Sequence, residues 1–189
     1  MASRHLKLSA FTKTLTCIAI VLAMHVLPSG AMAADGPERV ARAFYGLYLE
    51  IRPLGIPDEE TQSRFRPLMT GELSRLLRQA RAAEDAHREA TQNQEPPFVQ
   101  GDLFTSLYEG ATSYALGACA VEGKRAYCDI DLTYSEGSET RPTTWTDKLA
   151  LVQRAGNWQV DDIAFGGAWD FGQYGMLRQT LRDVVAQVK

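Results

Sequence analysis

The strongest constraint on the fold of this chain is a change in the spacing of its apolar residues. From residue 36 to residue 90 apolar side chains recur every three or four residues, as in amphipathic helices. From residue 113 to residue 165 they alternate with polar ones, as in strands that bury one face. Helical spacing returns at residue 177. A chain ordered in this way has to cover an antiparallel sheet with its helices, which predicts an α+β fold.

The expected elements follow from these stretches and from the turn residues between them. We expect helices over residues 36–51, 58–66 and 70–90, and a polar surface loop over residues 92–97. We expect four strands over residues 113–121, 125–135, 144–154 and 157–165, with hairpin turns at 122–124 and 155–157. A final helix is predicted by one apolar stripe: Leu177, Leu181, Val184, Val185 and Val188.

The first 33 residues have the features of an export signal. Three basic residues precede an apolar run at residues 17–27, and Ala31-Met32-Ala33 gives the A-x-A pattern of a cleavage site. A membrane span needs about 20 apolar residues, so a retained anchor is the weaker alternative. We therefore expect cleavage after Ala33, a periplasmic protein without a stable membrane span, and a single domain over residues 34–189.

Cys17 raises the question of lipid attachment. The residues before it, Thr14-Leu15-Thr16, make a poor lipid-attachment motif, and the apolar run follows this cysteine instead of preceding it. The sequence therefore favours a cleaved signal over a lipid anchor.

The charge of the mature chain excludes several classes of function. Residues 1–33 carry three of the 20 basic residues and none of the 23 acids, so 17 bases face 23 acids after cleavage. This balance does not favour nucleic-acid binding. His87 would be the only histidine left, so we expect no histidine-rich metal site. The sequence contains no P-loop, Gly-x-Gly-x-x-Gly or Gly-x-Ser-x-Gly pattern, and we expect no cofactor.

Three segments in order resemble a known family. They are Phe44-Tyr45 followed by Tyr48-Leu49, the run Pro-Pro-Phe-Val-Gln-Gly-Asp at residues 96–102, and Gly-Asn-Trp-Gln-Val-Asp-Asp-Ile at residues 156–163. Together they resemble the exported bacterial family catalogued as domain of unknown function 3828, which is similar to the nuclear-transport-factor-2-like cone folds. The resemblance implies a curved, cone-like antiparallel sheet around a helix and an exported location. It implies no established activity.

Cys119 and Cys128 are the two cysteines of the mature chain. If Gly123 and Lys124 form a two-residue turn, the cysteines face each other across the hairpin at a non-hydrogen-bonded position. An exported protein meets an oxidising compartment, so we predict a disulfide. The alternatives are two buried thiols or a redox pair, although no Cys-x-x-Cys motif is present.

The carboxylates of the predicted strands are the first candidates for chemistry. Asp129 and Asp131 share one strand face, which suits either general acid–base work or a solvated surface. On a regular strand Trp158 and Asp162 share a face and Asp161 points away. Since cone folds often hold a pocket on the concave face, Asp162 beside Trp158 is the best polar candidate. The alternative for Asp162 is a structural acceptor for backbone amides or an arginine.

The remaining candidates lie outside the predicted strand carboxylates. Asp102 follows Gly101 at what resembles a helix start, where it can cap the helix or line a pocket. Tyr108, Trp145 and Trp169 can line the same pocket or belong to the core. His87 lies in a charged helical stretch, where we expect exposure.

These observations favour an exported, non-catalytic binding or accessory protein of the bacterial envelope, with a small-ligand pocket or a surface for an envelope protein. One alternative is a carboxylate-based isomerase, dehydratase or hydrolase that uses the cone interior. Another is an inhibitor or immunity-type protein that binds through residues 92–97. A deep pocket with converging polar groups favours the enzyme, whereas a filled cone with an exposed apolar patch favours a protein partner.

Overall fold

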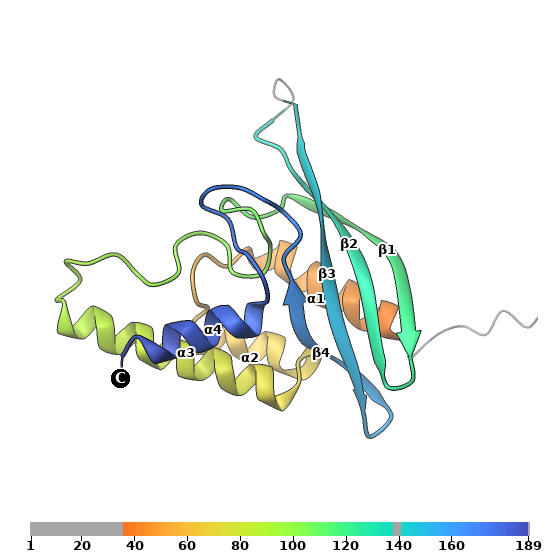
Figure 1. Ribbon diagram of the computed structural model, residues 1–189, viewed down its shortest axis with the longest axis horizontal. Coiled ribbons are helices and arrows are strands. Elements are labelled where there is room, and N and C mark those ends of the chain that lie inside the picture. The colour runs from red at the N-terminus through yellow and green to blue at the C-terminus, as the bar shows by residue number, and fades with distance from the viewer. Residues whose placement is uncertain (1–35, 138–140, 189) are drawn as a thin grey trace, which may run out of the picture. The chain divides into compact units, whose positions relative to one another are not determined.

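The computed structural model describes residues 36–137 and 141–188 (Figure 1). The predicted export signal at residues 1–33 lies outside the described residues, so its cleavage stays a prediction. The described elements run in the order α1, α2, η1, α3, β1, β2, β3, β4 and α4. This order of helices, strands and a last helix is the one that the apolar spacing predicts.

Helix α1 (Pro37–Ile51) begins at a proline, whose fixed φ suits the first turn, and carries Glu38 near the positive end of the helix. Its apolar face is fully buried and includes Phe44, Tyr45 and Tyr48. The helix ends at Arg52, which adopts a left-handed conformation and donates its backbone N–H to the Tyr48 carbonyl. The helix expected at residues 36–51 is confirmed.

The next helices begin at side-chain caps. Asp58 accepts from the Thr61 N–H at the start of α2 (Glu59–Phe65), which leads into the short 3-10 helix η1 (Arg66–Leu68). Thr70 accepts from the Leu73 N–H at the start of α3 (Gly71–Ala90). Each cap satisfies one backbone donor that the first turn leaves free.

Four strands form an open antiparallel sheet in the order β1-β2-β3-β4. They are β1 (Ser113–Glu122), β2 (Arg125–Tyr134), β3 (Thr143–Arg154) and β4 (Asn157–Ala164), each within about a residue of its predicted bounds. Figure 1 shows α1 lying across one face of this sheet. Helix α4 (Leu177–Ala186) follows β4 and packs against α3. The predicted α+β fold, with helices on an antiparallel sheet and a C-terminal helix, is confirmed.

The inner face of the sheet is filled by side chains. Phe44 of α1 contacts Phe104 edge-on, with ring centroids 5.4 Å apart, and Phe65 of α2 lies 5.0 Å from Phe104. All three rings are fully buried. The space between helices and sheet is therefore a packed core.

Cys119 and Cys128 are joined by a disulfide, with their Cα atoms 4.0 Å apart, as the hairpin pairing predicts. The register does not continue unchanged along the hairpin. A shift between Leu116 and Cys119 pairs Ser113 with Thr133, one residue away from the partner that a regular two-residue hairpin gives it. A β-bulge of this kind adds a residue to one strand and bends it.

The connection between α3 and β1 contains no helix, so the helix expected after Asp102 is wrong. The Asp102 carboxylate does cap backbone N–H groups, but they belong to Phe104 and Thr105 in a tight turn. Gly101 precedes this turn with φ of 77°, a left-handed conformation that favours glycine. The turn takes the chain back under α1 instead of starting a helix.

Candidate functional site

Asp147 joins β3 to two distant connections. It lies on the buried face of β3 with 1% of its surface exposed. Its carboxylate accepts from the Ser106 N–H at 2.9 Å, the Gly166 N–H at 2.8 Å and the Trp145 indole N–H at 3.1 Å, and also from the Ser106 hydroxyl. Four donors compensate for burying this charge. Asp147 thereby holds two connections at one edge of the core. They are the α3–β1 connection, residues 91–112, and the β4–α4 connection, residues 165–176.

Asp102 makes a second buried junction. Its Oδ1 accepts from the Phe104 N–H at 2.8 Å and the Thr105 N–H at 2.7 Å, and its Oδ2 accepts from the Tyr48 hydroxyl at 2.7 Å. Burial raises the pKa of Asp102 to about 6, and the hydrogen bonds offset part of that rise. Asp102 therefore fixes the α3–β1 connection to α1.

The two connections are also bonded directly to each other. Gly167 donates its N–H to the Ser106 hydroxyl oxygen at 3.0 Å, and Gln173 donates its N–H to the Ser106 carbonyl at 2.8 Å. At Gly172 there is no room for a side chain, because a Cβ would overlap the Ser106 carbonyl oxygen. This close approach brings Tyr108 of one connection near the aromatic residues of the other.

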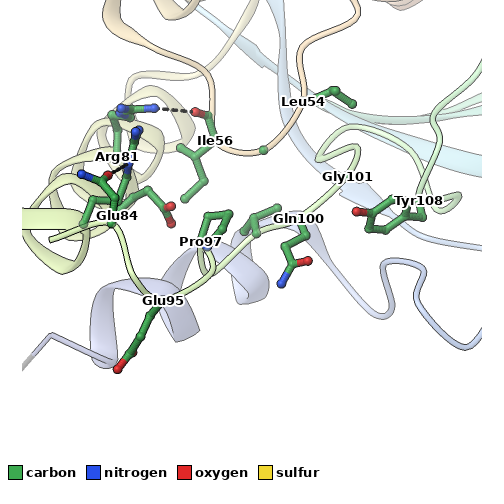
Figure 2. A pocket seen from close by; sticks show the side chains of 13 residues that line it. Leu54, Ile56, Arg81, Glu84, Glu95, Pro97, Gln100, Gly101 and Tyr108 are labelled. Carbon is green, nitrogen blue, oxygen red and sulfur yellow. Dashed lines mark hydrogen bonds between the residues drawn. The ribbon is translucent and has the colours of Figure 1, made fainter. Parts of the chain in front are cut away.

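Tyr108 lines four neighbouring hollows, and we call two of them together the Tyr108 groove. The first, the α3 hollow, measures about 530 Å³ and lies between α3, residues 54–56 and residues 93–101 (Figure 2). The second, the aromatic hollow, measures about 600 Å³ and has these principal lining residues: Leu107, Tyr108, Glu109, Trp169, Asp170 and Phe171. The groove lies where the two connections meet.

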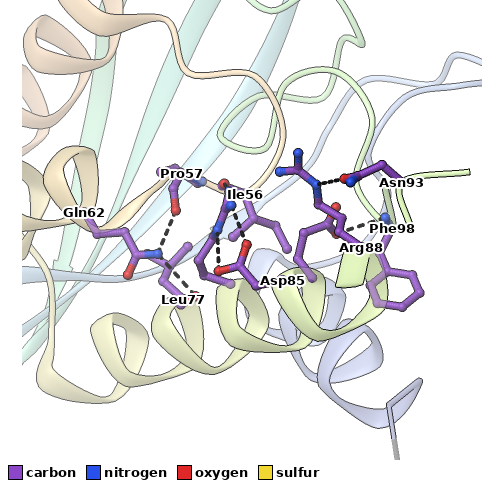
Figure 3. A network of polar contacts seen from close by, with 10 residues as sticks. Ile56, Pro57, Gln62, Leu77, Asp85, Arg88, Asn93 and Phe98 are labelled. Atoms are coloured by element: carbon purple, nitrogen blue, oxygen red, sulfur yellow. Dashed lines mark hydrogen bonds and ion pairs between the residues drawn. The ribbon is translucent and has the colours of Figure 1, made fainter. Parts of the chain in front are cut away.

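The walls of the α3 hollow are held by polar contacts (Figure 3). The Arg81 guanidinium donates to Asp85 and to the Ile56 carbonyl, and Arg88 donates to the Asn93 side chain at 3.1 Å. Glu84, which is 4% exposed, accepts from the Phe98 N–H at 3.0 Å. These contacts fold residues 93–98 back onto α3 and keep the hollow open beside them.

Several large apolar side chains are exposed on or beside the groove. Leu54 is 73% exposed, Phe171 83%, Tyr174 55% and Tyr108 41%. Single exposed apolar residues are ordinary, but a group around a hollow is typical of binding surfaces. Burial of this group by a partner would release ordered water from apolar surface.

The structure places the predicted site residues in separate settings. Tyr108 lines both hollows, and Asp102 lies beneath Tyr108 as the buried junction described above. Trp145 is 9% exposed and contacts Trp169 edge-on, with ring centroids 5.3 Å apart. Trp158 packs against the core from β4 and does not line the groove. Asp102 and Tyr108 do line one common hollow of about 500 Å³, and Trp145, Trp158 and Asp162 are not among its lining residues.

Asp162 lies away from the face of β4 on which the sequence places it. A register shift pairs Leu151 with Val160 and Ala150 with Asp162, so Asp161 is an extra residue in β4. The expectation of a regular strand is wrong, because this bulge moves Asp162 off the face that holds Trp158 and Val160. Its Oδ1 accepts from the Ile163 N–H and from the Arg178 N–H, each at 2.9 Å. Asp162 therefore supplies a cap to the first turn of α4.

Two further expectations have different outcomes. Asp129 pairs with Lys148, and Asp131 accepts from the Thr146 hydroxyl, while Ile130 and Leu132 between them are buried. The two aspartates thus lie on the outer sheet face, as the surface alternative expects. His87 was expected to be exposed, and this expectation is wrong. Its ring packs on Phe98, with ring centroids 4.3 Å apart, and only 15% of the side chain is accessible.

Asp147, Leu54, Phe171 and the arginines of α3 belong to this region but are not among the residues that the sequence predicts for a site. Asp147 could have been recognised from the sequence, because it takes the place of an apolar residue in the alternating buried positions Trp145, Asp147 and Leu149. An acid on the buried face of a strand indicates a carboxylate with several donors. Leu54 and Phe171 carry no such signal, because they lie in irregular segments.

Within residues 36–137 and 141–188, no helix combines the length and apolar character that crossing a membrane requires. The same residues contain no group of three or more histidine, cysteine or acidic side chains arranged to hold a metal ion.

The chain is similar to a lipoprotein of Escherichia coli. It is 25% identical over 156 residues to the uncharacterized lipoprotein YbjP of strain K12, and the match covers 82% of this chain and 81% of that protein. No protein-family profile matches the chain, so the resemblance to domain of unknown function 3828 stays a prediction.

Two solved structures are also similar to this chain. One is a SEC-C motif-containing protein from Rhodopseudomonas palustris, with a TM-score of 0.39 and 13% identity over 71% of this chain and 79% of that chain. The other is a protein of unknown function from Bacteroides thetaiotaomicron, with a TM-score of 0.41 and 17% identity over 68% of this chain and 88% of that chain.

Proposed function

We propose that this protein is exported to the bacterial envelope and acts there by binding a segment of another envelope protein in the Tyr108 groove. The observation that carries the proposal is the exposed group of Leu54, Tyr108 and Phe171 around hollows whose walls are fixed from beneath. A preorganised apolar surface loses little conformational entropy when a partner binds.

The location rests on three independent features. The chain begins with the pattern of an export signal, and its relative in E. coli carries the name of a lipoprotein. The Cys119–Cys128 disulfide fits an oxidising compartment. The proposal includes cleavage after Ala33, a single mature domain at residues 34–189, and membership of the exported family that the sequence resembles. N-terminal sequencing of protein recovered from the periplasm tests it, with Ala34 as the expected first residue.

The buried carboxylates support binding over catalysis. All four donors around Asp147 are groups of the protein itself, and both oxygens of Asp102 are occupied in the same way. A general acid or base has to reach a substrate proton within hydrogen-bond distance. The interior between α1 and the sheet is packed. Asp102 does line a hollow of about 500 Å³, but both of its oxygens already accept hydrogen bonds from the protein.

Site-specific photo-crosslinking in living cells tests the proposed function. A photoreactive phenylalanine analogue replaces Tyr108 or Phe171 in the groove, and Val121 on β1 serves as the matched exposed control. We expect the two groove positions to give the same crosslinked envelope protein and Val121 to give none. Crosslinks of equal yield from all three positions, or none from the groove, would contradict the proposal.

A further inference from the structure

The aromatic hollow differs from the α3 hollow in its charges. Tyr108, Trp169 and Phe171 supply three aromatic rings to its lining, and Glu109 and Asp170 are the two charged residues among those that line it. The α3 hollow instead contains Arg81 and Arg88 as well as acids. A hollow with aromatic walls and only acidic charges favours a positively charged occupant.

One aromatic wall, Trp169, is held in place before any partner binds. Trp169 packs edge-on against Trp145, whose indole N–H is fixed by Asp147 at 3.1 Å. The Tyr174 hydroxyl donates to the Trp169 carbonyl, and the backbone at Gly172 rests against Ser106. The Trp169 ring therefore keeps its orientation without a ligand, and Phe171 stays exposed beside it.

We propose that the aromatic hollow receives an arginine side chain of the partner segment that binds the Tyr108 groove. This inference rests on the proposed function and names the chemistry that the partner presents. A guanidinium is planar and weakly hydrated, so it stacks on aromatic faces at a small desolvation cost. Glu109 and Asp170 then accept its N–H groups or neutralise its charge at the mouth of the hollow.

The charge requirement can be measured with two matched peptides. The probes are acetyl-Gly-Arg-Gly-amide and the same peptide with citrulline, which replaces the guanidinium by a neutral urea of nearly the same shape. Binding to the mature protein is followed by the NMR shift of the Trp169 indole N–H. We expect the arginine peptide to bind about tenfold more tightly than the citrulline peptide.

Two sets of variants locate the effect in this hollow. Phe171→Ala and the double variant Glu109→Gln with Asp170→Asn alter exposed side chains, so the fold is expected to persist. Each should reduce the preference for arginine to about twofold or less. Glu122→Gln at the exposed end of β1 removes one acid elsewhere and should leave the preference unchanged. Titration with tetramethylammonium chloride separates arginine recognition from general cation binding, and equal affinity for this ion would overturn the assignment to arginine.

The outcomes separate this inference from the proposed function. If the two peptides bind equally, or neither shifts the Trp169 signal, the arginine assignment fails. The proposed function still stands in that case if Tyr108 and Phe171 crosslink to an envelope protein. If the groove gives no crosslink and neither peptide binds, both proposals fail.

Discussion

Tyr48 and Asp102, which are 54 residues apart, are joined by a hydrogen bond of 2.7 Å from the phenol to the carboxylate. The same phenol oxygen accepts from the Ala111 N–H at 2.8 Å. Burial raises the pKa of Tyr48, so its hydroxyl keeps its proton and remains a donor at neutral pH. Tyr48 thus connects α1 both with Asp102 and with Ala111, close to the start of β1.

Asp102 should make stability depend on pH. Its pKa of about 6 in the folded protein lies above the value of about 3.9 in the unfolded chain, so the folded state binds the proton more tightly between these values. The contribution of Asp102 is therefore complete below about pH 4 and is lost as pH rises towards 6. Relative to Asp102→Asn, the free energy of unfolding of the wild type should fall by about 2 kcal/mol between about pH 4 and pH 7.

Urea unfolding at several pH values measures this difference. Asp129→Asn on the outer face is the matched control, because it makes the same replacement at a partly exposed carboxylate. We expect the control to keep the pH dependence of the wild type. A difference between wild type and Asp102→Asn that stays constant across this range would contradict the raised pKa.

The elements were predictable because their signals are local. Gly36 followed by Pro37 marks the start of α1, Thr70 caps α3, and the alternation of Ile130 and Leu132 with aspartates gives the buried face of β2. Each signal acts within a few residues, so tertiary packing does not need to be known. The Cys119–Cys128 pairing was predictable for the same reason, since a short turn sets it.

The candidate site was less predictable because distant segments form it. Tyr108 and Phe171 line the same hollow because hydrogen bonds of Ser106 and Asp147 hold the two connections and β3 together. The strand face on which Asp162 lies depends on the bulge at the extra residue Asp161. The spacing of apolar residues in the sequence does not predict that bulge. A one-residue slip in a strand reverses the side that each later residue faces.

Asp147→Asn should destabilise the protein strongly. In the variant, an NH₂ group replaces one of the two carboxylate oxygens that accept these hydrogen bonds. The backbone or side-chain donors bonded to that oxygen would then stay buried without an acceptor. We expect a loss of about 2–4 kcal/mol in the free energy of unfolding, measured by urea denaturation at neutral pH. Asp131→Asn on the outer face should change it by less than about 1 kcal/mol. Equal losses for both variants would refute the role of Asp147 as a junction.

The disulfide should stabilise a short hairpin. Cys119 and Cys128 are separated by 9 residues, and the chain-entropy model gives about 2–3 kcal/mol for so short a loop. The double variant Cys119→Ser with Cys128→Ser should therefore unfold at lower urea, and a reductant should lower the midpoint of the wild type but not that of the variant. Alkylation of the unfolded, unreduced wild type should label neither cysteine, and labelling of both would disprove the disulfide.

Asp162 should stabilise the protein by capping α4, and it should not act as a carboxylate of a binding pocket. Helix α4 begins after Met176 without a side-chain cap of its own, and the Asp162 carboxylate accepts from the N–H of Arg178 in its first turn. Asp162→Ala removes this acceptor and should cost about 1 kcal/mol.

Asp162→Asn retains an oxygen at the same place and isolates the effect of charge. Burial raises the pKa of Asp162, so the charged form weakens the folded state as pH rises above the unfolded pKa of about 3.9. We expect the free energy of unfolding of the asparagine variant to lie within about 0.5 kcal/mol of the wild-type value at neutral pH. As pH rises from acid to neutral, the stability of the variant should increase relative to that of the wild type. Urea denaturation of the three proteins, with α4 followed by hydrogen exchange, measures both effects. If the alanine variant is as stable as the wild type and the amides of α4 exchange no faster, Asp162 does not cap this helix.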